Sequence, residues 1–178
     1  MRLRSCLAAL AIGILAGISV AELTIANDEA RMIRETRTIN RKEWRQLLFV
    51  MCYLHSITQE RRKFGPIGWN IPYEFNQSDL SACVQFLQNH VMEMDSKKAA
   101  APTWATIRYM VSDIQYGGRI TDDFVQLLMG TYSERYFHQG ILEQNVELFQ
   151  GYNVPDTDKI EDFRKAIEDL PGQDNPEL

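Results

Sequence analysis

The chain contains little cysteine and no excess of positive charge, and each shortage excludes a class of protein. Its three cysteines, Cys6, Cys52 and Cys83, are an odd number among 178 residues, so a disulfide framework is not expected. The 19 lysines and arginines are outnumbered by 24 aspartates and glutamates, which gives a net charge of −5. Because general nucleic-acid binders present basic surfaces, nucleic acid is not an expected partner.

The sequence motifs that hold phosphate groups or a serine nucleophile are also missing. No GxxxxGK[ST], GxGxxG or GxSxG pattern occurs in the sequence. The run Gly65-Pro66-Ile67-Gly68 cannot replace a phosphate loop, because proline lacks the amide hydrogen that a phosphate needs. We therefore expect no nucleotide hydrolysis by this chain, no catalytic residue, and no bound cofactor or metal.

A long apolar run occurs only near the amino terminus. It extends from Cys6 to Val20, about 15 residues, which is short for a membrane span, so a membrane is an unlikely partner. Arg2 and Arg4 precede the run, and Ser19-Val20-Ala21 resembles a cleavage site, as in a secretory signal peptide. Residues 1–21 are thus predicted to be a signal-peptide-like or apolar segment.

One alternative function follows from this segment, namely a secreted small helical interaction protein. The sequon Asn76-Gln77-Ser78 would then be a glycosylation site, although Ser78 also suits the start of a helix. Residues 22–40, which are polar and only weakly periodic, are predicted to form a linker.

Beyond residue 40 the apolar residues recur at three- and four-residue spacing, which predicts an all-α fold, a small helical bundle. Residues 41–137 are expected to form one helical domain, with helices that begin at Arg41, at Ser78 or Asp79, after Thr103 and at Thr121. Residues 138–178 form a second region, with a short helix near residues 142–149 and a last helix at residues 158–170. No strand pattern of useful length is seen. The expected inward residues are Trp44, Leu47, Leu48, Met51, Leu54 and Thr58; Leu80, Cys83, Val84, Leu87, Val91 and Met94; Trp104, Ile107, Val111 and Ile114; Phe124, Leu127, Leu128 and Thr131; and Ile160, Phe163, Ile167 and Leu170.

The richest segment is FGPIGWNIPYEF, residues 64–75, which combines prolines, glycines and four aromatic residues. Ordering it costs about 1–2 kcal/mol per residue, so its aromatic rings must bury most of their area against some surface. The prolines reduce that cost by restricting the unfolded chain. We interpret the segment as a rigid docking loop. The candidate interface residues are Phe64, Pro66, Trp69, Pro72, Tyr73 and Phe75, together with Arg119 from the run QYGGRITDDF.

Two other clusters are weighed as chemical sites. Asp122 and Asp123 are an adjacent acidic pair, but carboxylates at the start of a helix are explained by its unpaired amides and dipole. Cys52, His55, Cys83 and His90 share helix faces and suggest a zinc-stabilised helical module. They lack the ligand spacing of zinc modules, and core packing explains the same faces.

The two signature runs resemble dynein heavy chains of the axonemal type. HSITQERRKFGPIGWNIPYEFNQSDL and YMVSDIQYGGRITDDF are similar to the lid subdomain of the sixth AAA+ module, and residues from about 152 resemble the start of the C-terminal domain. The likeness spans roughly residues 41–178, and residues 1–40 are not expected to match the family. Such a chain would be a fragment of a much longer protein or an incomplete gene model.

The resemblance implies an AAA+ lid-like bundle with a mechanical function. Its partners would be other AAA+ modules and the C-terminal domain of a dynein heavy chain, and it would meet microtubules only through the parent motor. The implied location is the cytoskeleton of a ciliary axoneme. No catalytic residue is carried over, because the matched motifs are structural in that family.

Overall fold

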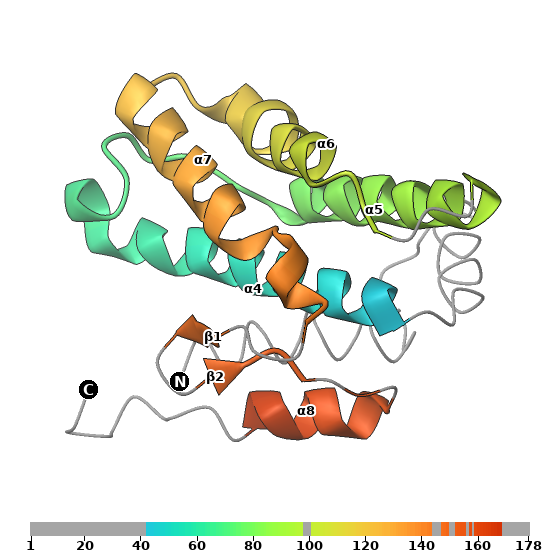
Figure 1. Cartoon of the computed structure of the whole chain (residues 1–178). Coiled ribbons are helices and arrows are strands. Elements are labelled where there is room, and N and C mark those ends of the chain that lie inside the picture. The colour runs from blue at the N-terminus through green and yellow to red at the C-terminus, as the bar shows by residue number, and fades with distance from the viewer. Residues whose placement is uncertain are drawn as a thin grey trace, which may run out of the picture.

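The computed structural model describes residues 42–97, 101–143, 147–149, 152–155, 157 and 159–168. The predicted amino-terminal segment and linker lie outside the described residues. The longer elements are α4 (Lys42–Arg61), α5 (Gln77–Lys97), α6 (Trp104–Tyr109), α7 (Asp123–Tyr136) and α8 (Ile160–Glu168), with the short strands β1 (Glu147–Phe149) and β2 (Tyr152–Asn153). A π-helical turn, Met110–Gln115, continues α6, and 3-10 turns occupy Arg62–Ile67, Gly117–Arg119 and Gln139–Ile141. Figure 1 shows these elements.

Helix α4 lies in the middle of the molecule. In Figure 1, α5, α6 and α7 cover one side of α4, and the two strands and α8 cover the other. Consistent with this position, every residue from 46 to 56 of α4 is buried. Other elements thus pack on both sides of α4, and their side chains form one hydrophobic core with it. The prediction of an all-α fold is confirmed.

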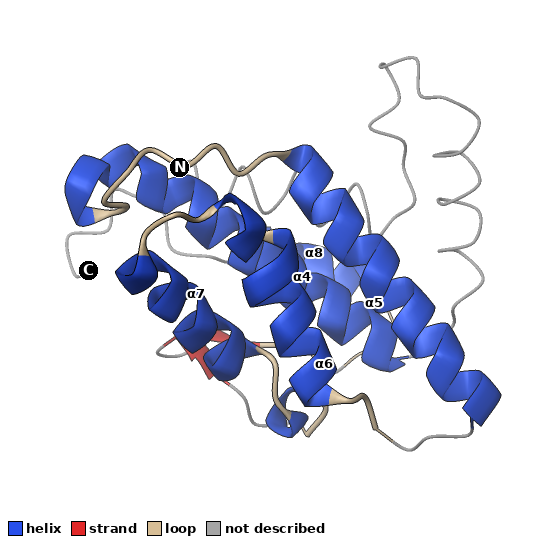
Figure 2. Ribbon diagram, turned by 90° about the horizontal axis from the view of Figure 1, so that it is seen from above, coloured by secondary structure: helices blue, strands red, loops and turns tan. Residues whose placement is uncertain are grey.

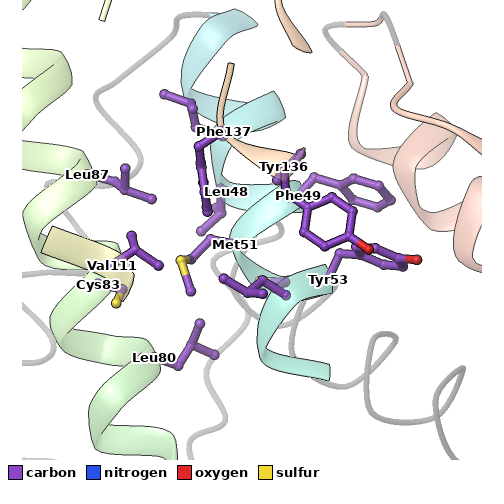
Figure 3. Close-up of a cluster of buried hydrophobic side chains, with 14 of the residues drawn as sticks. Leu48, Phe49, Met51, Tyr53, Leu80, Cys83, Leu87, Val111, Tyr136 and Phe137 are labelled. Carbon is purple, nitrogen blue, oxygen red and sulfur yellow. The ribbon is translucent and has the colours of Figure 1, made fainter. Parts of the chain in front are cut away.

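The inward faces predicted for the first two helices are confirmed. All six predicted residues of α4 and all six of α5 are buried. Figure 3 shows Leu80, Cys83 and Leu87 of α5 pointing toward Met51 and Leu48 of α4. A regular spacing of three and four residues was sufficient here because both helices are long and uninterrupted.

The other side of α4 is aromatic. Phe49 packs against Phe163 of α8 with ring centroids 5.5 Å apart, and Tyr53 lies 6.5 Å from both Phe149 and Tyr152. Phe163 and Ile167 of α8 are buried in the same core as α4. The division between residues 41–137 and 138–178 stays a prediction, but side chains from both ranges share this core.

The predicted short helix at residues 142–149 is wrong. In the described residues, a 3-10 turn ends at Ile141, and Glu147–Phe149 pairs antiparallel with Tyr152–Asn153. Leu148 and Tyr152 point inward while Glu147 and Asn153 are exposed. This alternation of burial suits a strand, and it is too brief for a sequence pattern to reveal.

The inward face predicted for the third helix is only partly right. Ile107 and Val111 are buried, but Ile114 is 45% exposed and Tyr116 takes the inward place. The reason is the π-helical turn, in which the Tyr116 amide donates to the Val111 carbonyl at 3.1 Å. In such a turn the bonded residues are five apart instead of four, so the buried residue that follows Val111 is Tyr116 and not Ile114. Thr103 precedes this helix but makes no side-chain capping bond.

The inward face predicted for the fourth helix is largely wrong, because only Leu128 of its four residues packs against the core, and it is only partly buried. Phe124 is 78% exposed and Leu127 is 69% exposed, whereas Val125 and Met129 are buried. The buried stripe of α7 also includes Ser133 and Tyr136. A helix that is apolar on two faces gives no sequence signal for which of them meets the core.

Candidate interaction surface

The loop of residues 64–75 follows α4 directly and has a fixed backbone. Gly65 has a φ of +55°, a conformation that favours glycine, and its carbonyl accepts from the amides of Gly68 and Trp69, both at 2.9 Å. A Cβ on Gly68 would lie 1.8 Å from the Arg61 carbonyl oxygen. The two glycines therefore let the chain turn sharply and return to the end of α4.

Three of the four aromatic rings in this loop are buried within the chain. Trp69 and Phe75 pack in a T-shape at 5.5 Å, and Tyr73 lies 5.9 Å from Phe75. Beneath them, Phe75 lies 5.4 Å from the ring of Tyr116. The surface against which these three rings are buried is thus provided by the chain itself. Phe64 differs because it is 65% exposed, and its docking role stays a prediction.

Polar contacts fasten the same loop to α4. The indole nitrogen of Trp69 donates to the Thr58 carbonyl at 3.2 Å, and the side-chain amide of Gln59 donates to the Phe75 carbonyl. Two buried or partly buried carbonyl acceptors are satisfied in this way. The loop is held by hydrogen bonds as well as by packing.

Arg61, at the end of α4, makes more polar contacts with the loop than any residue predicted from the sequence. Its Nε and Nη2 donate to the Gly68 carbonyl at 3.1 and 2.6 Å, and its Nη1 donates to the Tyr132 hydroxyl at 2.9 Å. The guanidinium carbon lies 4.9 Å from the Trp69 ring centroid and 5.7 Å from that of Tyr132. We call this set, Arg61 with Gly68, Trp69 and Tyr132, the Arg61 clamp.

The far end of the loop is attached to the first turn of α7. The Tyr73 hydroxyl accepts from the amides of Thr121 and Asp122 at 3.3 and 3.2 Å. The Asn70 side chain donates to Asp122 Oδ2 at 3.3 Å. Figure 2, seen from above, shows the tan loop that precedes α5 and the tan loop that precedes α7 at the same end of the bundle.

Asp122 is a capping residue. Its Oδ1 accepts from the Val125 amide at 3.0 Å, so the helix starts at Asp123, two residues after the expected start at Thr121. The hydrogen bond from Val125, helped by that from Asn70, lowers the pKa of Asp122 below its ordinary value. The interpretation of this carboxylate as a helix-start residue, in place of a catalytic one, agrees with these contacts.

Arg119 pairs with Asp79 of α5, and neither member of the Asp122–Asp123 pair is its partner. Its Nε donates to Asp79 Oδ1 at 2.8 Å. The other oxygen of Asp79 accepts from the Asn76 amide at 2.8 Å, and Asn76 Oδ1 accepts from the Ser78 amide at 2.9 Å. Asn76 is therefore the cap of α5, where Ser78 or Asp79 was expected. The docking role of Arg119 stays a prediction.

The contacts of His55 and His90 do not resemble a zinc site. His55 Nδ1 and the Tyr116 hydroxyl are 2.8 Å apart, and His90 Nε2 accepts from the Thr103 amide at 3.1 Å. Burial lowers the pKa of His55 to about 4 and raises the pKa of Cys83 to about 12. In the described ranges, no group of three or more His, Cys, Asp or Glu residues could hold a metal ion.

The outward side of the loop is apolar. Ile67 is 90% exposed, and Phe64, Ile71, Pro66 and Pro72 are exposed beside it. A shallow depression of about 230 Å³ is lined by Arg62, Gly65, Pro66, Trp69, Asn70 and Pro72. We call Phe64, Ile67 and Ile71 the loop face, and Phe124 with Leu127 the α7 face. The described helices include none that is long and apolar enough to cross a membrane.

Sequence reasoning missed Arg61, Tyr132, His55 with Tyr116 as a pair, and the α7 face. Arg61 lies with Arg62 and Lys63 in a short basic run, and cations at the end of a helix are explained by its dipole without any further partner. No sequence signal joins Arg61 to Tyr132, because they lie 71 residues apart. Only the glycines of the loop hinted that the backbone would return to α4.

Comparison with known proteins identifies the family of the chain. A family model described as the dynein heavy chain AAA lid domain matches residues 44–178. The chain belongs to the dynein heavy chain AAA lid family. The likeness of its two signature runs to axonemal dyneins is thereby confirmed.

Three relatives illustrate the match. The chain is 56% identical over 175 residues to the dynein gamma chain of the flagellar outer arm of Chlamydomonas reinhardtii, covering 94% of this chain. It is 46% identical to mouse dynein axonemal heavy chain 5 and 37% identical to the ciliary dynein beta chain of Heliocidaris crassispina, each over 76% of this chain. The chain spans only 3–4% of the length of these relatives.

The first of these matches corrects one expectation. Residues 41–178 are too few to make up 94% of the chain, so the similarity to the Chlamydomonas gamma chain extends into residues 1–40. The expectation that residues 1–40 do not match the family is therefore wrong. Similarity to a dynein across this segment gives no support to the secreted alternative.

Proposed function

We propose that this chain is a non-catalytic structural lid of a dynein-type AAA+ motor, in which it supports ATP-driven movement carried out elsewhere in the assembly. The observation that carries the proposal is the loop of residues 64–75, which is fastened to its own bundle while its outer side chains stay exposed. A loop built in this way presents a fixed apolar surface and needs no partner to order it.

The exposed side chains of the loop define what it could contact. Phe64, Ile67 and Ile71 offer apolar area that water does not stabilise, and isolated soluble domains seldom gather such residues in one short loop. A neighbouring protein surface that covers them would gain roughly 1.5–3 kcal/mol per fully buried side chain. The proposed partners are other AAA+ modules and the C-terminal domain of a dynein heavy chain.

Placement in the cell follows from the relatives. The names of the matched proteins are those of axonemal, flagellar and ciliary dyneins, so we place this chain in the cytoskeleton of a ciliary axoneme. Contact with microtubules would occur only through the parent motor. The candidate docking residues are Phe64, Pro66, Pro72 and Arg119 on the outside, while Trp69, Tyr73 and Phe75 anchor the loop that carries the first three.

The non-catalytic part of the proposal is tested by calorimetric titration of the full chain with ATP and Mg²⁺. No binding heat is expected, because the sequence holds no phosphate loop and the Asp122 carboxylate is engaged as a helix cap. Tight, saturable ATP binding would overturn it.

The docking part is tested with the portion of the sixth AAA+ module that precedes the matched region in the Chlamydomonas gamma chain. Binding of the full chain is expected, and the double change of Phe64 and Ile67 to serine should weaken it at least about tenfold. The matched control is Met92→Ser, a change of another exposed apolar residue on α5. Equal losses in both variants, or no binding at all, would contradict the proposed surface.

A further inference from the structure

The loop face and the α7 face belong to segments about 60 residues apart, yet one side chain joins those segments. The loop is bound by Arg61 through Gly68 and Trp69, and α7 is bound by the same guanidinium through Tyr132. We infer that Arg61 is a mechanical coupler, a positioning residue that makes the loop and α7 respond to displacement together.

The geometry of the guanidinium supports this role. Its five N–H donors lie in one plane, and here Nε and Nη2 are directed at one carbonyl while Nη1 is directed at a hydroxyl on another element. The Trp69 and Tyr132 rings both lie within 6 Å of the cation, which favours holding the charge between them. A movement of Gly68 away from α4 would have to break or drag the contact with Tyr132.

The backbone leaves the loop little other freedom at this point. A Cβ on Gly68 would overlap the Arg61 carbonyl, so only glycine lets the chain lie this close to the end of α4. Tyr73 and Asn70 fasten the later part of the loop to the first turn of α7, and Tyr132 lies nearer the other end of that helix. The Arg61 clamp therefore supplies a second attachment between the loop and α7. With one attachment near each end of α7, the loop and the helix are held in a fixed relative position.

The coupling is a property of this chain alone, so it goes beyond the proposed docking role and can hold or fail independently of it. Its consequence is that a partner that displaces the loop face would alter the α7 face, without direct contact between the two. Each face would report the occupancy of the other.

The experiment is amide hydrogen exchange of the full chain, read by mass spectrometry in peptides that cover the loop, both halves of α7 and the middle of α5. Arg61→Gln is expected to speed exchange about tenfold or more in both the loop and α7, with a smaller change in α5. The matched control is Arg62→Gln, which removes the neighbouring exposed charge and should leave all of these peptides unchanged.

A double-mutant cycle separates coupling from simple destabilisation. Tyr132→Phe removes only the hydroxyl that Arg61 contacts, and it should speed exchange in the loop, where it changes no residue. In the Arg61→Gln background the same change should have no further effect on the loop. Additive effects, or a Tyr132→Phe effect confined to α7, would overturn the inference. If Arg61→Gln does not fold, Arg61→Lys keeps the charge without the planar fork, and the cycle is measured on that variant.

Discussion

The loop of residues 64–75 and helix α7 contrast in how their sequence relates to their surroundings. The loop is dense in aromatic residues and suggests an external partner, yet three of its four rings pack within the chain. Helix α7 reads as an ordinary amphipathic helix, yet it leaves Phe124 and Leu127 in solvent. The aromatic residues of the loop thus marked a segment that packs against its own chain. On α7, the regular spacing of apolar residues wrongly assigned Phe124 and Leu127 to the core, although both are exposed.

The largest expected effect concerns Trp69. Changing Trp69 to Ala should lower the free energy of unfolding by about 3–5 kcal/mol, because it removes a buried ring, its hydrogen bond to Thr58 and its contact with Arg61. Urea denaturation measures the change. Phe64→Ala is the matched control in the same loop and should change the free energy by no more than about 0.5 kcal/mol. Equal losses of unfolding free energy in the two variants would contradict the distinction between the buried and exposed sides of the loop.

The next effect concerns the polar contact beneath the loop. Burial lowers the pKa of His55 from its ordinary 6.5 to about 4, opposed in part by the Asp79 carboxylate. The unfolded chain therefore takes up a proton near pH 6.5, whereas the folded chain does so only near pH 4. Stability from this group is present above pH 6.5 and is lost as the pH falls toward 4, by up to about 3 kcal/mol.

Urea midpoints measured between pH 7 and pH 4 would show this loss. His55→Gln keeps a group that can hydrogen-bond to Tyr116 but cannot titrate, so its stability should fall less steeply over the same range. Parallel curves for the two proteins would mean that other groups account for the pH dependence.

A smaller effect is expected at the glycine contact. Gly68→Ala would place a methyl group against the Arg61 carbonyl and should cost about 1–3 kcal/mol. Gly118→Ala is the matched control, because a Cβ there meets nothing within 4 Å, and its stability should be unchanged or slightly raised. Thermal or urea unfolding of the two variants measures the difference. A tolerated Gly68→Ala would show that the loop can move away from α4 at little cost.

The smallest effect on stability is expected on the α7 face. Changing Phe124 and Leu127 together to serine should alter the free energy of unfolding by no more than about 0.5 kcal/mol per residue, since both are exposed. The same variant should self-associate less than the parent chain in sedimentation experiments, because it removes exposed apolar area. Val125→Ser on the same helix is the control and should destabilise the fold instead. A parent chain that is monomeric at high concentration would contradict the predicted self-association.

The burial of a residue could be predicted where it depends on local spacing, and could not where it depends on a local change in helix geometry. The faces of α4 and α5 follow from local spacing over long helices. Tyr116 was missed because one extra residue in a π-helical turn shifts the face, and spacing alone does not reveal such a turn.

The candidate site shows the same division. Pro66, Pro72 and the glycines identified a rigid loop, because their backbone restrictions are local properties. Arg61 was not singled out, since its contacts with Gly68 and Tyr132 exist only after the chain has folded back on itself. The Asn76 cap was misplaced by two or three residues, as helix ends commonly are.

The central position of α4 has a consequence for synthesis on the ribosome. Phe49 and Tyr53 are made about 100 residues before the rings that cover them, which are Phe149, Tyr152 and Phe163. Until that later stretch leaves the exit tunnel, one side of α4 faces water, and the nascent chain is open to chaperones and to aggregation. The time needed to translate these roughly 100 residues therefore sets how long the aromatic side of α4 stays exposed.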